Sequence, residues 1–127
     1  MGSRRFHGPG RDHSGASKIL HFSGQVALEP DANSDMGVSV VHAGDIRGQM
    51  QAAPANIDAV LRKAGMERSD IISLRFFTTD VDGFLANYDA YAEWIGPAKT
   101  RPPQSLLGVN RLVLPELLVE IEATAAG

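Results

Sequence analysis

The sequence predicts a single α+β domain in which two helices cover one face of a mixed β-sheet. Apolar residues recur at helical spacing in two stretches, and stretches with the alternation of a β-strand precede and follow each of them. The 127 residues suit one domain, and the contents of hydrophobic (43%) and charged residues (21%) are usual for a globular protein. The expected order is β-β-α-β-α-β-β, with a short extra strand before the first helix.

The chain is expected to consist of a flexible segment, residues 1–17, and a single domain, residues 18–127. The flexible segment is rich in Gly, Ser, His and Arg. Lys18–Leu28 alternates weakly and predicts a strand that Ser23-Gly24 bends or interrupts. The elements expected next are a turn over 29–35 and a short strand over Val38–Val41.

A helix of about five turns follows, because seven apolar residues lie on one helical face: Ile46, Met50, Ala53, Ile57, Val60, Leu61 and Ala64. Asp45 is the expected N-cap and Gly65 the residue after the C-cap. Gly48 and Pro54 argue against one unbroken helix. Either a kink at Pro54 or a restart with Pro54 in the first turn would satisfy the pattern.

The second half repeats the strand–helix pattern and ends in two strands. The predicted strands are Ile71–Thr79, Ser105–Leu112 and Leu117–Ala125, the last two joined near Leu114-Pro115. Asp80 or Asp82 caps the second helix, which Gly96-Pro97 ends. The apolar stripe of this helix consists of Phe84, Tyr88, Tyr91 and Ile95, and a proline-rich loop over 97–104 follows it.

The last strands predict a sheet with two different faces. Val119, Ile121 and Ala123 should point under the helices, since they alternate with polar residues. The second face is expected to hold Leu106, Gly108, Leu118, Glu120, Glu122 and Thr124. This mixture is too apolar for open water and too polar for a core. We therefore expect the second face to be buried against other copies of the chain.

Composition excludes several classes of protein. The absence of cysteine excludes disulfides, thiolate metal sites and cysteine nucleophiles. No stretch is apolar for long enough to span a bilayer, and the first residues lack the apolar core of a secretory signal. A cytoplasmic location without a membrane partner is therefore expected.

The charge distribution argues against a nucleic-acid partner. The formal net charge is −3, and residues 1–18 contribute +3, so the remainder carries −6. A nucleic-acid-binding protein would need a basic face. The four histidines show no pair at metal-ligand spacing, and the chain has no nucleophile elbow, P-loop or dinucleotide fingerprint. No metal and no organic cofactor are expected.

Several segments, in order and at matching intervals, carry a resemblance to a known family. They are Ser23-Gly24-Gln25-Val26, Gln49…Asn56-Ile57…Val60-Leu61…Ala64-Gly65…Asp70-Ile71, Phe84…Asn87-Tyr88…Tyr91, Arg101-Pro102, Leu107-Gly108-Val109 and Leu118-Val119-Glu120-Ile121-Glu122-Ala123. Over roughly residues 18–126 the chain resembles the RidA/YjgF family, which is also labelled endoribonuclease L-PSP. The resemblance implies a chorismate-mutase-like fold and a homotrimer whose sheets form a central barrel, with a cleft between each pair of subunits. It also implies hydrolysis of reactive enamines and imines, such as 2-aminoacrylate, to 2-oxo acids and ammonia without a cofactor.

The resemblance also assigns roles to individual residues. Glu120 matches the family glutamate that orients the attacking water, and Gly24 matches a glycine whose backbone lines the cleft. Asn87 matches a polar helix residue near the cleft, and Leu106 is expected to line it. On the residues alone, Glu120 could equally be a solvated strand glutamate, Gly24 a simple strand bend, and Asn87 an exposed helix residue. Tyr88 and Tyr91 are expected to belong to the core.

The chain departs from the family pattern at the substrate carboxylate. The family arginine that grips this carboxylate corresponds to Gln104, or to Ser105 if the loop alignment slips by one residue. Neither residue can form the fork-shaped ion pair of a guanidinium. Arg101 is the expected substitute, with Arg75 and Arg111 as weaker candidates, although a loop arginine is often simply exposed. The family tyrosine near the N-terminus has no clear match.

These features leave two hypotheses for the function. The first is a hydrolase that deaminates an imine, an enamine or a related substrate, with Glu120 and a water molecule as its chemical centre. The second is a module that binds a small metabolite without turnover, which the missing arginine favours. A ribonuclease follows from the family label alone and fits the acidic body poorly.

Overall fold

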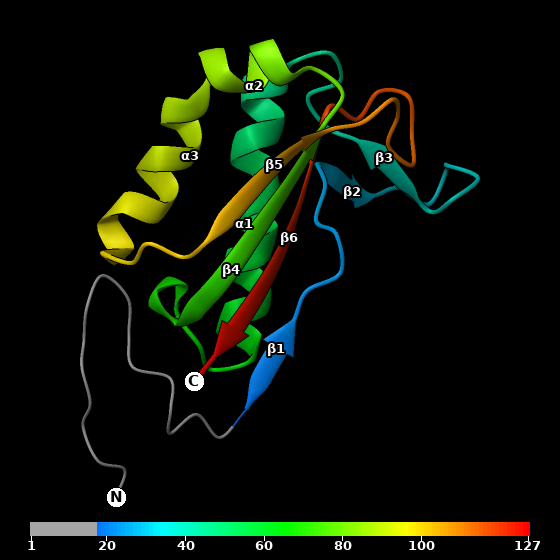
Figure 1. The fold of residues 1–127 in the computed structure, drawn as a ribbon. Coiled ribbons are helices and arrows are strands. Elements are labelled where there is room, and N and C mark those ends of the chain that lie inside the picture. Colours follow the sequence, from blue (N-terminus) through cyan, green and yellow to red (C-terminus); the bar gives the residue numbers. More distant parts are fainter. Residues whose placement is uncertain (1–17) are drawn as a thin grey trace, which may run out of the picture.

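The computed structural model describes residues 18–127, so the segment 1–17 predicted to be flexible lies outside the described residues. Figure 1 shows an α+β arrangement with the helices behind a twisted sheet. The strands are β1 (Ile19–His21), β2 (Leu28–Pro30), β3 (Val38–Val40), β4 (Ile71–Thr78), β5 (Gln104–Gly108) and β6 (Val119–Ala126). The helices are α1 (Ile46–Lys63), α2 (Val81–Ala86) and α3 (Tyr88–Ile95), with short 3₁₀ helices η1 (Arg68–Asp70) and η2 (Gly96–Ala98).

The main sheet has the strand order β1-β6-β4-β5, and β2 and β3 form a separate hairpin. β6 runs antiparallel to β1 and β4, whereas β5 runs parallel to β4. A parallel neighbour requires a crossover connection, which α2 and α3 supply. The core lies between the sheet and the helices and includes Ile57, Phe76 and Ile121. The opposite face of the sheet is not covered by any helix of the described residues.

The predicted strand Lys18–Leu28 is divided in the structure. Only Ile19–His21 pairs continuously with β6, and Gln25 then forms an isolated bridge to Ile121. β2 joins the other sheet and includes Glu29 and Pro30, so the expected turn over 29–35 was placed too early. The side chain of Glu120 occupies the space beside Gly24, which separates the chain there from regular pairing.

The first helix is continuous through Pro54, so it does not restart there. Asp45 caps it as predicted, because its carboxylate accepts a hydrogen bond from the Gly48 N–H (3.1 Å). Gly65 follows the C-cap with φ +70°, the left-handed conformation that favours glycine. Proline lacks an N–H and therefore costs one helical hydrogen bond. Burial of Met50 and Ile57 on the core-facing side offsets this loss.

The second predicted helix is two helices that meet at Asn87. Asp80, not Asp82, is the N-cap of α2, and its carboxylate accepts from the Gly83 N–H (2.9 Å). Asn87 takes a non-helical conformation and donates its side-chain N–H to the Gly83 carbonyl (2.9 Å). This side-chain bond competes with the helical pattern and explains the break. The following strand, β5, begins at Gln104 and ends at Gly108 rather than at Leu112.

The two faces of the sheet follow the predicted alternation in β6 but not in β5. Val119, Ile121 and Ala123 are buried, and Glu120 lies on the uncovered face. Leu106 pairs with Phe76, which is buried under the helices, so Leu106 lies on the helix-covered face. The prediction that Leu106 and Gly108 share a face with Glu120 was therefore wrong by one residue in phase, and Leu107 takes that place opposite Phe77.

The buried side chain of Gln49 connects α1 to the segment that leads into β6. Its amide N–H groups donate to the carbonyls of His42 (3.1 Å) and Glu116 (3.0 Å), and its Oε1 accepts from the Leu118 N–H (2.7 Å). All of its hydrogen-bonding groups are thus used inside the protein, where an unpaired group is costly.

We expect Gln49→Ala to lower the free energy of unfolding by about 3 kcal/mol, because it leaves a buried N–H and two carbonyls unpaired. Urea unfolding monitored by circular dichroism measures the change. Gln51→Ala, at an exposed position of the same helix, is the control and should change the free energy by less than about 0.5 kcal/mol. Equal effects of the two substitutions would contradict the assigned role of Gln49.

Candidate functional site

The carboxylate of Glu120 lies directly against the backbone of Gly24. A Cβ atom built on Gly24 would come within 2.3 Å of Glu120 Oε2, so no other residue fits at position 24 while this carboxylate keeps its place. Glu120 sits in β6 opposite Phe77 of β4. The structure therefore brings together two of the residues that the sequence analysis selected.

The surroundings of Glu120 favour its protonated form. Burial raises the pKa of the Glu120 carboxyl above its ordinary value, and the negative charge of Glu122 raises it further. A carboxyl group with a raised pKa exchanges protons more readily near neutral pH. The position is suited to general acid–base chemistry.

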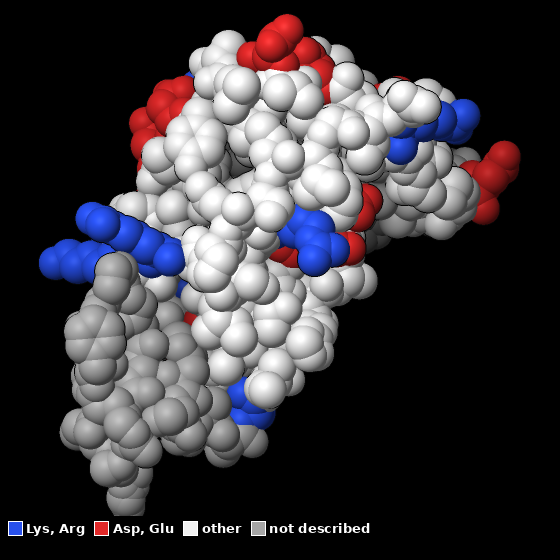
Figure 2. All heavy atoms as spheres, in the orientation of Figure 1, with Lys and Arg blue, Asp and Glu red and all other residues white. Residues whose placement is uncertain are grey.

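The uncovered face of the sheet around Glu120 is mostly uncharged. Figure 2 shows this face toward the reader, with a basic group beside acidic atoms near its centre and few other charges there. Arg75 and Glu122 form an ion pair on it at 3.7 Å. A cavity of about 360 Å³ lies beside this pair and is lined also by Ser73 and Ser105. A half-apolar face of this kind is common at contacts between subunits.

The side chain of Gln104, at the start of the edge strand β5, is hydrogen-bonded to two tyrosines of α3. Tyr91 donates its O–H to Gln104 Oε1 (2.7 Å), and Gln104 Nε2 donates to the Tyr88 oxygen (2.9 Å). Burial raises the pKa of Tyr91, which keeps its proton on the phenol. The proton of Tyr88 has no acceptor among residues 18–127. It remains available to donate to another group.

Arg101 and Asn87 lie apart from Glu120 in the described chain. Arg101 lines a cavity of about 660 Å³ beside α3, together with Tyr88 and Tyr91. The Asn87 Oδ1 accepts a long hydrogen bond from Arg47 (3.4 Å), whose guanidinium also pairs with Asp89 (2.8 Å). Asn87 therefore supports the junction of α2 and α3, and its amide is engaged in the isolated chain.

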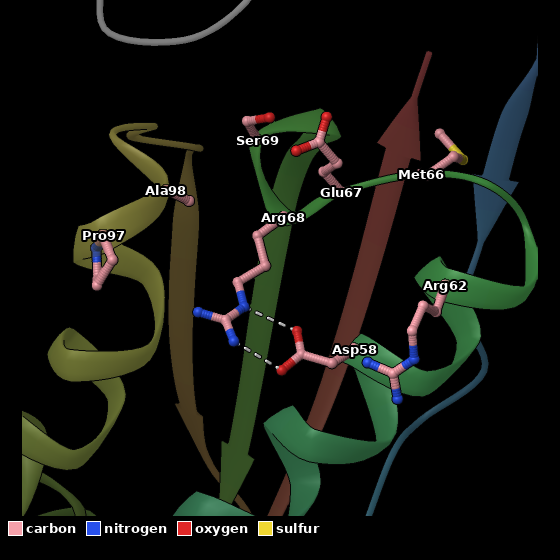
Figure 3. Close-up of a pocket in the computed structure, with 8 residues that line it drawn as sticks. All are labelled: Asp58, Arg62, Met66, Glu67, Arg68, Ser69, Pro97 and Ala98. Carbon is pink, nitrogen blue, oxygen red and sulfur yellow. Dashed lines mark hydrogen bonds and ion pairs between the residues drawn. The ribbon is translucent and has the colours of Figure 1, made fainter.

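A further cavity of about 450 Å³ opens between the end of α1 and η1. Figure 3 shows Arg68 and Asp58 pointing toward each other across it, and their closest contact is 2.9 Å. Asp58 also accepts from the Trp94 indole N–H (3.0 Å), and Arg68 donates to the Trp94 carbonyl (2.8 Å). Because Arg68 and Asp58 at the centre of this cavity are paired with each other, neither is available to bind a charged ligand.

Residues 18–127 hold neither a cluster of metal-ligating side chains nor a helix that could span a membrane. No three His, Cys, Asp or Glu side chains there gather as a metal site would require. None of the helices in that range is both apolar enough and long enough to cross a bilayer.

Comparison with known proteins places these features in a family. The family described as Endoribonuclease L-PSP matches residues 13–127. The chain belongs to this family. A RutC family protein of Pyrococcus horikoshii is 31% identical over 110 residues, which cover 87% of this chain and 80% of the relative.

Solved structures of the Rid/YjgF family have the same fold. The Rid family protein YyfB of Yersinia pestis, whose function is described as unknown, is 37% identical with a TM-score of 0.71, and the match covers 88% of this chain and 80% of YyfB. TdcF of Escherichia coli, solved with bound serine, is 26% identical with a TM-score of 0.72, and the match covers 99% of this chain and 91% of TdcF.

Within this Rid family fold, the candidate residues form two groups in a single chain. Gly24 and Glu120 lie together on the uncovered side of β6, whereas Leu106 lies on the helix-covered face and Gln104 is bound to α3. Both Tyr88 and Tyr91 were expected in the core, and their hydrogen bonds to Gln104 were not predicted. Tyr91 is buried, but Tyr88 is 37% exposed. Their spacing of three residues, one helical turn, was the available signal.

The raised pKa of Glu120 predicts a pH-dependent effect of Glu120→Gln on stability. The folded chain binds this proton more tightly than the unfolded chain does, so the group's contribution to stability is fully present below the ordinary pKa of glutamate. That contribution is lost as the pH rises through the raised value. The neutral glutamine avoids the loss, so Glu120→Gln should gain stability relative to the native chain at pH 7 but not at pH 4.

Thermal unfolding at the two pH values measures this difference, and Glu93→Gln, at an exposed position of α3, is the matched surface control. A relative gain for Glu120→Gln that is larger at pH 4 than at pH 7 would show that the carboxylate is stabilised, not destabilised, by its surroundings.

Proposed function

We propose that this Rid family protein is a small-metabolite hydrolase that deaminates reactive enamine or imine intermediates to carbonyl compounds and ammonia. The observation that carries the proposal is the Glu120 carboxyl, packed against Gly24 with a raised pKa. Family membership supports the same reaction, because the residues around Glu120 follow the family pattern. Neither a metal nor an organic cofactor takes part in the proposed chemistry.

Hydrolysis of an imine needs proton transfers that one carboxyl group can supply. Glu120 removes a proton from water as the oxygen bonds to the imine carbon, and it returns a proton to the nitrogen. The resulting carbinolamine breaks its C–N bond, and ammonia leaves as the carbonyl forms. An enamine first takes up a proton on carbon to become the imine. One water is consumed and one ammonia released in each turnover.

The proposed site is completed by a second copy of the chain. Glu120 with Gly24 lies on one side of the sheet, and Gln104 with Leu106 lies on the other, at the edge strand β5. A homotrimer with its sheets arranged as a barrel would bring the two groups together in each cleft between subunits. The uncovered, mostly uncharged face of the sheet supports such an assembly. Asn87, beside the junction of α2 and α3, would border the same cleft.

Gln104 indicates that the substrate differs from the usual 2-imino acids. A glutamine offers neutral hydrogen bonds where an arginine would neutralise a carboxylate. The cavity with Arg101 lies on the α3 side of Gln104. Arg101 could therefore supply the missing charge only from that side. A small metabolite with a weakly charged or neutral group next to the imine suits the site best.

The net negative charge of the chain argues against a nucleic-acid partner, and the proposed enzyme is cytoplasmic.

The alternative is a Rid family protein that binds a small ligand without turnover. Both ends of the Gln104 amide are already bonded to tyrosines, which leaves few donors for a substrate carboxylate. The related TdcF was solved with serine, a small amino acid. Binding without catalysis would preserve the cleft but make Glu120 dispensable.

Ammonia release from freshly generated 2-aminoacrylate and from a neutral imine separates the two functions. We expect the native chain to accelerate hydrolysis and Glu120→Ala to lower the acceleration by about a hundredfold, the usual loss on removing a general base. Glu116→Ala, which removes an exposed carboxylate shortly before the same strand, is the matched control and should keep the native rate. Rates equal to buffer with both substrates would exclude the deaminase and leave the binding function.

The assembly makes an independent prediction. Light scattering should give a mass of about three times the 13.6 kDa of one chain. A monomer at micromolar concentration would rule out a cleft between subunits, whatever the outcome of the activity assay.

A further inference from the structure

The cavity beside α3 has the walls of a ligand site. Its volume is about 660 Å³, within the usual range for small-molecule pockets. One wall consists of the aromatic and aliphatic side chains Tyr88, Tyr91 and Ile95, and the other of the loop residues Lys99, Thr100 and Arg101. The loop reaches this position because Lys99 adopts a left-handed conformation (φ 56°) that turns the chain after η2.

The charge of this cavity is opposite to that of the chain. Lys99 and Arg101 line it, and among residues 18–127 no acidic residue does. Neither cation forms an ion pair with any residue of the described chain. Of the other arginines, Arg47, Arg68 and Arg75 are paired with carboxylates, whereas Arg62 and Arg111 form no ion pair within residues 18–127. What distinguishes this position is that two cations line one cavity without an acidic neighbour from residues 18–127, which favours an anionic ligand.

Thr100 supplies a second observation that points to a ligand. The residue is 7% exposed, yet its hydroxyl forms no hydrogen bond with any residue from 18 to 127. Buried hydroxyl groups are nearly always bonded, since an unpaired one costs free energy. Tyr88 adds a phenol whose proton also has no acceptor within residues 18–127. The cavity is thus lined by two cations and by two hydroxyl groups whose protons have no acceptor in that part of the chain, beside an apolar wall.

We propose that the cavity between α3 and residues 99–101 binds a small organic acid, with its carboxylate at Lys99, Thr100 and Arg101 and its apolar body on the tyrosine wall. The carboxylate accepts from the guanidinium and the Thr100 hydroxyl, which are charge-assisted hydrogen bonds. The body packs on Tyr91 and Ile95. The site is separate from Glu120 and does not depend on the proposed reaction.

The binding experiment uses phenylacetate as the probe and its neutral amide, phenylacetamide, as the matched ligand control. Titration calorimetry on the full chain measures affinity. Fluorescence gives a second signal, because the sole tryptophan, Trp94, has its ring 5.9 Å from that of Tyr91. Phenylacetate should bind at least about tenfold more tightly than phenylacetamide, since the amide cannot pair with the cations.

Three variants locate the site. Arg101→Gln should weaken phenylacetate binding about tenfold, as the loss of a charge-assisted hydrogen bond predicts. Thr100→Val should also weaken binding but leave the unfolding midpoint unchanged, because the hydroxyl bonds no residue from 18 to 127. Lys63→Gln, an exposed basic residue outside the cavity, is the control for overall charge and should keep native affinity.

Several results would overturn this site. They are equal affinity for the acid and its amide, no detectable binding of either, or equal losses in Arg101→Gln and Lys63→Gln. Glu120→Ala separates this site from the proposed cleft, because it should retain phenylacetate binding even where it abolishes ammonia release. Loss of binding in Glu120→Ala would assign the acid to the cleft instead.

Discussion

The hydrogen bonds of the Gln49 side chain determine how the last strand enters the sheet. Gln49 holds the Leu118 N–H and the Glu116 carbonyl, two groups just before β6 begins. Because side chains alternate along a strand, the position of Leu118 decides which face every later residue of β6 occupies. A slip of one residue would bury Glu120 under the helices and expose Ile121. One buried amide on α1 therefore determines that Glu120 reaches the open face next to Gly24.

Gln104, at the position where the family resemblance predicts an arginine, changes more than one contact. A guanidinium at this position would carry a fixed charge, whereas the glutamine forms a neutral chain that runs from Tyr91 through its amide to Tyr88. Tyr91 donates to Gln104 and Gln104 donates to Tyr88, so the direction of the chain is defined and the Tyr88 proton has no acceptor within residues 18–127. Where an arginine would place a positive charge, the protein therefore presents the neutral phenol of Tyr88. Such a group selects a ligand by hydrogen-bond geometry.

The long periodic segments could be predicted from the sequence, and the irregular ones could not. The caps Asp45 and Gly65 and the alternation of Val119–Ala123 rest on local chemistry, which the structure bears out. The phase of β5 was missed because it depends on pairing with β4, a long-range contact. The continuity of α1 through Pro54 likewise reflects burial against the core, which outweighs local propensity. At the candidate site, the Gly24–Glu120 contact could be anticipated only through the family pattern, since the two residues are far apart in the chain.

The positions of the basic side chains bear on how a negatively charged ligand could be bound although residue 104 is a glutamine. In the described residues, Arg75 is neutralised by Glu122 on the open face, and the unpaired cations near the sheet's β5 edge are those of the loop 99–101. The loop residues line the same cavity as Tyr88 and Tyr91, and both tyrosines are hydrogen-bonded to Gln104. An anion at the loop that accepted the Tyr88 proton would make the Tyr88 oxygen a stronger acceptor for the Gln104 amide. The loop cations and the hydrogen bonds of Gln104 therefore adjoin the same phenol, that of Tyr88, whereas Glu120 lies on the other face of the sheet.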